Sequence, residues 1–299
     1  MLFRQLEYFV ALARERHFAR AAAACYVSQP ALSEAIRKLE HELDVPLVVR
    51  GHAFEGLTPE GERLVRWAQR ILADHDALKQ EVTALRSGLS GRLRLGVIPS
   101  ATPTAARLVA PFCAAHPLAQ VSLAGSLRSA EIVRRLRAFE LDAGLLYPDA
   151  ATDPELVCHE LYTEEHVLVV GRELAGTLPE RAAWAQIAHL PLCLLEGGMR
   201  GRQLLDEALA ERGLRLEPQV ETDSVASALA QAATGQWATV VPRLWLRSLA
   251  PVGDMRVIHL HDPVVRLPIA LVTHAATPGP LLLRAFADSA LGLDWDEER

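Results

Sequence analysis

The stretch from Ser28 to Leu43, SQPALSEAIRKLEHEL, constrains the fold of this chain more than any other. Leucine and isoleucine recur at positions 32, 36, 39 and 43 with helical spacing, so one stripe of this helix should be buried. Ser28 suits the N-cap because its hydroxyl can accept a hydrogen bond from a backbone N–H of the first turn. The Ala-rich segment 19–25 and the short link Tyr26-Val27 precede it. Two helices joined so closely predict a helix-turn-helix, whose second helix fits the major groove of DNA.

A second face of the same helix carries side chains that can reach base edges. Gln29, Ser33 and Arg37 recur every four residues, with Pro30 and Glu34 beside them. Glutamine pairs well with adenine and arginine with guanine, while an apolar ring can pack on a thymine methyl group. We therefore predict that this face reads DNA. The alternative for Arg37 is an ordinary solvated charge.

The residues after this helix predict a winged form of the motif. Residues 45–50, VPLVVR, favour a short strand, residues 51–56 form a turn, and Leu57 leads into the next helix. We assign residues 1–58 to a winged helix-turn-helix domain whose wing tip meets phosphate or the minor groove. The predicted DNA contacts are Ser28, Gln29, Pro30, Ser33, Arg37, Lys38, Arg50 and His52.

A long linker helix is predicted over residues 59–87. It begins with a capping threonine, a proline and an early carboxylate at Thr58-Pro59-Glu60. Apolar residues repeat every seven positions along it, which favours pairing with the same helix of a second copy. The alternative is packing against the effector domain of the same chain. The predicted dimerisation residues are Leu64, Ala68, Ile71, Leu78, Val82 and Leu85.

The pattern changes after the linker helix. Residues 88–91, GLSG, predict a flexible hinge. Beyond it, strand-like runs such as 166–170 and 267–274 alternate with helical patterns, which indicates an α/β fold with helices on both faces of a sheet. Residues 92–162 and 267–299 are predicted to form one lobe of an effector domain, and residues 163–266 a second lobe inserted within it.

Net charge and composition say less than the motifs about which molecules this protein binds. The net charge is −6, and residues 1–90 hold twelve basic and twelve acidic residues, so a phosphate-binding surface must come from the placement of charges. The four cysteines are far apart and form no CxxC pair, which favours reduced thiols over a metal or redox site. We find neither a signal peptide nor a run of about 18 apolar residues, and therefore expect a cytoplasmic protein without membrane contact.

The sequence resembles the LysR-type transcriptional regulators, most specifically over its first 65 residues. The matching positions are Ala21-Ala22, VSQPALS at 27–33, Ile36, Leu39-Glu40, Leu43, Leu47, Arg50 and LTPEG at 57–61. The resemblance implies a homodimer or homotetramer that binds promoter DNA under the control of a small molecule. It further implies two lobes like those of periplasmic binding proteins, RNA polymerase as another partner, and no cofactor. Ala19 and Glu34 depart from the family pattern and predict an altered site preference.

Two helix starts in the predicted effector domain have the composition of anion-binding sites. Residues 98–103, IPSATP, supply two hydroxyls, and residues 196–202, EGGMRGR, supply two arginines. Helix N-termini favour anions, so we expect a small carboxylate or inorganic anion as the effector. The alternatives are ordinary helix capping by Thr102 and solvated charges for the arginines. By resemblance, the effector contacts are Ser100, Ala101, Thr102, Leu127, Arg128, Tyr147, Met199, Arg200 and Arg202.

Three other classes of function compete with this interpretation. His259 and His261 share one face of a strand and could hold a metal ion, although no third ligand follows at a suitable spacing. The sequence contains no GxSxG, GxGxxG or HExxH motif, so we predict neither enzyme activity nor a metal site. A ligand carrier would explain residues 91–299 but not the first 90. A structural DNA-binding protein would not need so large an effector domain.

Overall fold

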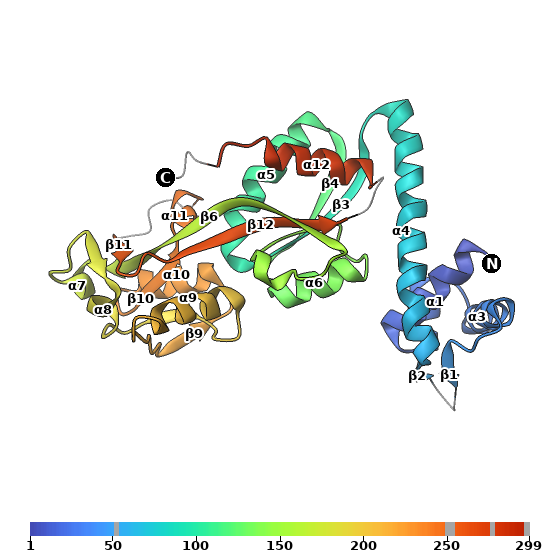
Figure 1. Cartoon of the computed structure of the whole chain (residues 1–299), viewed down its shortest axis with the longest axis horizontal. Helices are drawn as coiled ribbons and strands as arrows, with labels where there is room; N and C mark the ends of the chain where they lie inside the picture. The colour runs from blue at the N-terminus through green and yellow to red at the C-terminus, as the bar shows by residue number, and fades with distance from the viewer. Residues whose placement is uncertain (51–53, 249–254, 276–278, 296–299) are drawn as a thin grey trace. The chain divides into compact units, whose positions relative to one another are not determined.

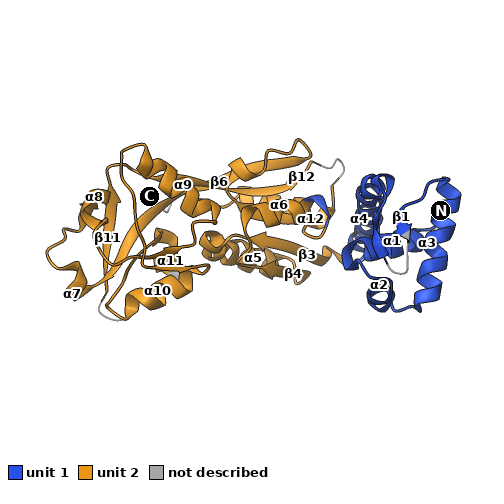
Figure 2. Cartoon of the chain, turned by 90° about the horizontal axis from the view of Figure 1, so that it is seen from below, with its two compact units in different colours: residues 1–87, 137–139 blue, residues 88–136, 140–299 orange. Residues whose placement is uncertain are grey.

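The computed structural model describes residues 1–50, 54–248, 255–275 and 279–295, with the elements labelled in Figure 1. The chain forms two compact units, coloured separately in Figure 2. The first comprises residues 1–87 and the segment 137–139, and the second comprises residues 88–136 and 140–299. His52, which the sequence assigns to the tip of the wing, lies outside the described residues.

The first unit is the predicted winged helix-turn-helix followed by one long helix. Its core consists of apolar side chains from α1, α2 and α3, with Phe9, Leu12 and Leu32 almost fully buried. Ala21 and Ala22 let α2 lie close to its neighbours, because a methyl group adds so little bulk. The elements are α1 (Phe3–Glu15), α2 (Phe18–Ala24), α3 (Gln29–Leu43), β1 (Val48–Arg50), β2 (Phe54–Leu57) and α4 (Pro59–Ser87).

Helix α3 begins and ends for local reasons. The Ser28 hydroxyl accepts a hydrogen bond from the Ala31 N–H at 3.4 Å, which satisfies a free donor of the first turn. Asp44 ends the helix in the left-handed conformation, with φ of 52°. The buried stripe consists of Leu32, Ile36 and Leu39. Leu43 is 37% exposed, so the predicted stripe is wrong at its last position, where the helix runs past the core.

Polar contacts fasten the wing to α3 and cap the start of α4. Glu40 Oε1 accepts hydrogen bonds from the backbone N–H groups of Leu47 at 2.9 Å and Val48 at 3.1 Å. Thr58 Oγ1 accepts one from the N–H of Gly61 at 2.9 Å. A Cβ atom at Gly61 would overlap the Leu47 carbonyl oxygen, so glycine alone allows α4 to start this close to the wing.

Helix α4 is divided between two environments. Leu64, Ala68 and Ile71 pack on the core of the first unit, where α1 covers this side of the helix. These three side chains therefore contribute to the core of their own domain, and their assignment to a dimer interface stays a prediction. Leu78, Val82 and Leu85 lie beyond this core and are 63%, 52% and 83% exposed. Within the described ranges no helix, α4 included, is long and apolar enough to cross a membrane.

The second unit is the predicted α/β fold. Its strands are β3 (Ser90–Val97), β4 (Leu118–Ala124), β5 (Ala143–Leu146), β6 (Leu156–Gly171), β7 (Arg181–Ala183), β8 (Cys193–Leu195), β9 (Val220–Thr222), β10 (Ala238–Pro242), β11 (Met255–His261) and β12 (Arg266–His274). Its helices are η1 (Pro99–Ala101), α5 (Thr102–Ala115), α6 (Ser129–Arg137), η2 (Pro148–Ala150), α7 (Arg172–Ala175), α8 (Trp184–Ile187), α9 (Arg200–Ala210), α10 (Val225–Ala233), α11 (Arg243–Ser248) and α12 (Leu281–Leu291).

One long strand, β6, joins the two ends of this unit. Over residues 156–165 it pairs antiparallel with β12, which continues through β5 and β3 to the edge strand β4. Over residues 166–171 it pairs with β10 on one side and β11 on the other. The strand order β4-β3-β5-β12-β6-β11-β7 is therefore continuous, and Figure 1 shows β6 and β12 running together through the middle of the unit.

The first half of β6 is longer than its sequence predicts. Only residues 166–170, HVLVV, form a continuous apolar run, whereas the preceding LVCHELYTEE mixes charges with apolar residues. Tertiary pairing with β12 makes these residues extended as well. As a result Tyr162, Glu164 and His166 point to the same face of one strand, since side chains alternate along it.

Replacement of Glu40 should loosen the contact between α3 and the wing. Glu40→Ala leaves the two N–H groups without this acceptor, and we expect a loss of about 1–3 kcal/mol in the free energy of unfolding. Hydrogen exchange measured by mass spectrometry should show faster exchange in the peptide that contains Leu47 and Val48. Glu40→Gln, which keeps an acceptor oxygen, and the exposed Glu42→Ala should both exchange nearly as the native chain does. Unchanged exchange in Glu40→Ala would contradict this role.

Candidate functional site

The exposed face of α3 presents most of the residues predicted to contact DNA. Gln29, Pro30, Arg37 and Lys38 are exposed, while Ser33 is half-buried. Because the opposite stripe of the helix is fully buried, the backbone that carries these side chains is held by the core. Arg50 is the last residue of β1, on the strand that enters the wing.

An ion pair lies in the middle of this face. Arg37 Nη1 is 3.6 Å from Glu34 Oε2, one helical turn away. The two side chains are 61% and 54% exposed, so solvent screens the attraction and its contribution to stability is small. Glu34, the residue that departs from the family pattern, therefore sits beside the arginine expected to bind a base. A carboxylate at this point opposes the approach of any polyanion.

A tyrosine just before α3 is a further candidate that the sequence did not single out. Tyr26 is 96% exposed although it is large and aromatic, and its φ of 56° is uncommon for a residue other than glycine. It lies in the turn between α2 and α3, two residues before the cap Ser28. Only its exposure in the fold distinguishes it from a core tyrosine.

The second unit brings several predicted effector residues together around Tyr147. The Tyr147 hydroxyl lies 3.1 Å from Ser100 Oγ and donates a hydrogen bond to Glu164 Oε2 at 3.1 Å. A Cβ atom at Gly201 would overlap the Tyr147 hydroxyl, so the start of α9 packs directly on this ring. Ser100, Tyr147 and Glu164 are 4%, 3% and 3% exposed. We call Ser100, Tyr147, Tyr162 and Glu164 the buried polar cluster.

The arginines expected to bind an anion already have carboxylate partners. Arg128 pairs with Glu196 at 2.7 Å. Arg200 pairs with both Asp149 and Glu207. Arg202 is 7% exposed, pairs with Asp206 at 2.9 Å, and lines a separate cavity near the end of α9. An anion would therefore have to displace these carboxylates, and Arg202 stands apart from the buried polar cluster.

The remaining predicted effector residues have structural contacts. Thr102 does not cap α5, because its hydroxyl donates to the Pro99 carbonyl oxygen at 3.1 Å and Ala101 occupies the N-cap position. Ala101 is fully buried and Met199 is 6% exposed at the start of α9. Leu127 packs against the core while its N–H donates to Val97. Their role in binding an effector stays a prediction.

Glu164 is the residue of this region that sequence reasoning missed. Burial raises its pKa to about 7, although the nearby hydroxyls of Ser100, Tyr147 and Tyr162 partly oppose the shift. Glu164 Oε1 has no hydrogen-bond partner among the described residues. Burial likewise raises the pKa of Tyr147 and Tyr162 and lowers that of His166 to about 4. Glu164 lies in the segment 156–165, where charged and apolar residues are mixed, so the sequence pattern does not predict that its side chain is buried.

The described residues hold no group of three or more histidine, cysteine or acidic side chains arranged to bind a metal ion. His259 and His261 both lie on β11, which pairs with β6 and β7. The two histidines are therefore strand residues without a third ligand within the ranges that the structure covers.

Two protein families match this chain. Residues 3–62 match the family described as "Bacterial regulatory helix-turn-helix protein, lysR family". Residues 86–293 match the family described as "LysR substrate binding domain". The two matches fall on the first unit and on the second unit respectively, and together they include both candidate sites.

Known relatives are similar to this chain over nearly its whole length. The "SDS degradation transcriptional activation protein" of Pseudomonas sp. is 34% identical and covers 99% of this chain and 96% of its own. The "Hydrogen peroxide-inducible genes activator" of Dickeya chrysanthemi is 29% identical, covering 93% and 91%. Among solved structures, a full-length OxyR variant from Pseudomonas aeruginosa has a TM-score of 0.77 and 26% identity, and covers 98% and 99%.

The stability of the second unit should depend on pH through Glu164. Its folded pKa of about 7 exceeds the ordinary 4.5, so the folded state binds the proton more tightly and stability falls as pH rises from 4.5 through 7. The loss reaches about 3 kcal/mol at most. Glu164→Gln removes this slope. His166 has the opposite slope between about 4 and 6.5, but it is present in both proteins and cancels in their difference.

Urea unfolding of the native chain and Glu164→Gln at pH 5 and pH 8 measures this difference. Tryptophan fluorescence is suited to it because four of the five tryptophans, all but Trp67, lie in the second unit. We expect the glutamine variant to gain stability relative to the native chain as pH rises. A difference that is equal at both pH values would show that Glu164 keeps an ordinary pKa.

Proposed function

Because this chain belongs to the LysR family of DNA-binding transcriptional regulators, we propose that α3 reads promoter DNA with Gln29, Pro30, Ser33 and Arg37 and that a small molecule in the second unit controls this binding. The observation that carries the first part is the exposed polar face of α3 opposite a fully buried stripe. RNA polymerase is the downstream partner, the site of action is the cytoplasm, and no catalytic step is involved.

Within this face, Arg37 makes the base-specific contact with DNA, and Glu34 weakens that contact. Arginine binds guanine through two hydrogen bonds, and such a pair is worth about 1–3 kcal/mol of discrimination. Glu34 competes for the same guanidinium at 3.6 Å and repels phosphate. Tyr26 and Lys38, both exposed beside this face, add contacts to sugar and phosphate that position the helix.

The test compares α3 variants on a duplex selected by this protein from random DNA and on a scrambled duplex of the same composition. Arg37→Ala should weaken binding to the selected duplex by about 5- to 150-fold, and binding to scrambled DNA far less. Glu34→Gln should strengthen binding to the selected duplex by roughly three- to tenfold, because it frees Arg37 and removes a repulsive charge.

The exposed Glu7→Gln on α1 changes the net charge by the same amount and is the matched control. Equal losses on both duplexes for Arg37→Ala would show that this residue contacts only phosphate. An equal gain for Glu7→Gln and Glu34→Gln would show that net charge, and not the pair, explains the effect.

We propose that α4 mediates dimerisation through the exposed part of the predicted apolar seam, extended by Trp67. Trp67, Leu78, Val82 and Leu85 lie within about 60° of one another around the helix axis. Their exposed fractions are 61%, 63%, 52% and 83%. Large apolar side chains at such spacing are typical of a helix that pairs with a second helix. A symmetric dimer supplies the second α3 that a palindromic promoter site requires.

Leu78→Asp should separate this dimer, because it places a charge in the middle of the apolar stripe. Light scattering after size-exclusion chromatography should give the mass of one chain, 32.7 kDa, or an intermediate average. Thr83→Asp introduces the same charge on the opposite side of α4 and should leave the assembly unchanged. If Leu78→Asp keeps the native mass, the stripe does not hold the copies together.

In this proposal the protein responds to the binding of a small molecule and not to the oxidation of a cysteine thiol. A relative carries a name that refers to hydrogen peroxide, and peroxide reacts with exposed thiolates. In this chain burial raises the pKa of Cys25, Cys158 and Cys193, which disfavours the thiolate. None of the four cysteines belongs to the buried polar cluster. A small molecule bound next to that cluster, where β6 passes from β12 to β10 and β11, would alter both halves of the sheet.

A further inference from the structure

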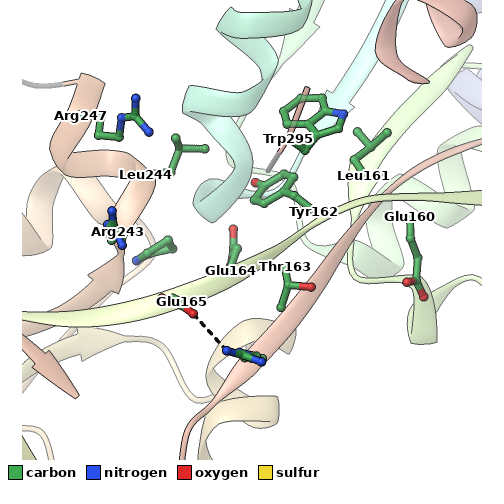
Figure 3. A pocket seen from close by; sticks show the side chains of 12 residues that line it. Glu160, Leu161, Tyr162, Thr163, Glu164, Glu165, Arg243, Leu244, Arg247 and Trp295 are labelled. Atoms are coloured by element: carbon green, nitrogen blue, oxygen red, sulfur yellow. Dashed lines mark ion pairs between the residues drawn. The ribbon is translucent and has the colours of Figure 1, made fainter. Parts of the chain in front are cut away.

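A cavity of about 520 Å³ lies over the middle of β6, beside residues that the sequence did not single out. Figure 3 shows its walls: the central residues of β6, the helix α11, and Trp295 beyond α12. This volume is in the range of cavities that hold small ligands. The cavity adjoins the buried polar cluster through Tyr162 and Glu164, which belong to both.

The floor of the cavity is a buried carboxyl with one free oxygen. Glu164 Oε2 accepts a hydrogen bond from Tyr147, whereas Oε1 has no partner among the described residues. In Figure 3 the Glu164 side chain points from β6 into the space between Leu244 and Tyr162. A buried carboxylate oxygen without a donor is unfavourable, and a cationic donor complements it best.

Positive charge enters the same cavity from α11. Arg243 and Arg247, one turn apart on this short helix, both line it. Arg243 has no ion-pair or hydrogen-bond partner among the described residues, so its guanidinium is available to an anionic group. Arg266, which also lines the cavity, is paired with Glu165 at 3.6 Å. The cavity therefore offers an anion subsite at α11 and a cation subsite at Glu164.

An aromatic wall lines the cavity on the side of Glu164 that faces away from the two arginines, as Figure 3 shows. The rings of Tyr162 and Trp295 are stacked with centroids 5.4 Å apart and an interplanar angle of 19°. Thr104 fixes the Tyr162 hydroxyl at 2.5 Å, and the Arg107 guanidinium lies 5.4 Å from the centroid of Trp295 on its ring face. The wall is thus preformed, so an apolar group that packs on it does not have to order these side chains.

We propose that this cavity binds a free amino acid with an apolar or aromatic side chain: its ammonium group at Glu164, its carboxylate at Arg243 and Arg247, and its side chain against Tyr162 and Trp295. This inference names the class of effector and so rests on the proposed function. It extends the anionic effector expected from the sequence to a zwitterion, since a cavity lined by both arginines and glutamates complements both charges.

Calorimetric titration of the full-length protein with three probes tests the two subsites without DNA. L-Phenylalanine carries both charges, 3-phenylpropanoate lacks the ammonium group, and 2-phenylethylamine lacks the carboxylate. We expect phenylalanine to bind about tenfold or more tightly than either of the others, because each loses one charged hydrogen bond. Failure of phenylalanine to bind at millimolar concentration, or binding no tighter than 3-phenylpropanoate, overturns the proposal.

Substitutions test which residue binds the ammonium group of the ligand and which binds its carboxylate. Glu164→Gln should weaken phenylalanine and 2-phenylethylamine about tenfold and leave 3-phenylpropanoate unchanged. Arg243→Gln should weaken phenylalanine and 3-phenylpropanoate and leave the amine unchanged. Arg215→Gln, an exposed arginine that does not line this cavity, is the matched control and should bind all three as the native chain does. Equal losses for all probes in Glu164→Gln would assign this residue a purely structural role and overturn the cation subsite.

Proton release gives a readout on the native chain that needs no variant. An ammonium group lowers the pKa of Glu164 from about 7, so phenylalanine binding at pH 7 should release a fraction of a proton, and 3-phenylpropanoate should release none. Calorimetric titrations in phosphate and in Tris buffer distinguish the two ligands, because released protons change the measured heat by an amount that depends on the buffer. The other ionisable groups that face Glu164 are Arg243, Arg247, Tyr147 and Tyr162, and burial raises the pKa of the two tyrosines further above neutral pH. No release with phenylalanine overturns the contact at Glu164.

Gel-shift titration separates failure of this inference from failure of the proposed function. If phenylalanine binds as described but leaves the affinity for the selected duplex unchanged, the cavity is an amino-acid site and the effector role is wrong. If a different compound changes the affinity for DNA and phenylalanine does not bind, the effector role stands and the assignment of the cavity is wrong.

Discussion

The pairing of β6 is the constraint on which the second unit depends. A single strand supplies backbone hydrogen bonds to β12 over its first half and to β10 and β11 over its second half. Neither end of the unit can change its position relative to the other without bending this strand or β12. A group that binds at the middle of β6 therefore acts where a small displacement is transmitted to both ends through hydrogen-bonded strands.

Burial of Glu164 follows from the same pairing. Extended backbone at residues 156–165 fixes which side chains face inward, and it places the Glu164 carboxyl beside Tyr147, which in turn contacts Ser100 and Gly201. Burial raises the pKa of this carboxyl to about 7, and its Oε1 atom has no hydrogen-bond partner among the described residues. A buried acceptor without a donor costs free energy, which is why this carboxyl favours its protonated form.

Three glutamates of the first unit show how position in the fold decides the role of one residue type. Glu40 turns toward the wing and accepts two backbone hydrogen bonds, so it is part of the scaffold. Glu34 lies on the opposite, exposed face and pairs with Arg37, so it tunes the surface that meets DNA. Glu42, near the end of α3, pairs with the amino terminus. The spacing of the three in the sequence does not by itself distinguish these roles.

Periodicity and capping in the sequence determined α3, the winged motif, the long helix α4 and the α/β alternation, because these depend on contacts between residues close along the chain. Tertiary structure alone decided which half of the apolar seam of α4 is free, since α1 covers Leu64, Ala68 and Ile71 and leaves Leu78, Val82 and Leu85 exposed. It also decided that Glu164 and Arg243, almost eighty residues apart, line one cavity, and that Arg128 and Arg200 meet carboxylates. Charges distant in sequence find their partners through the fold, and no local pattern records which of them will remain unpaired.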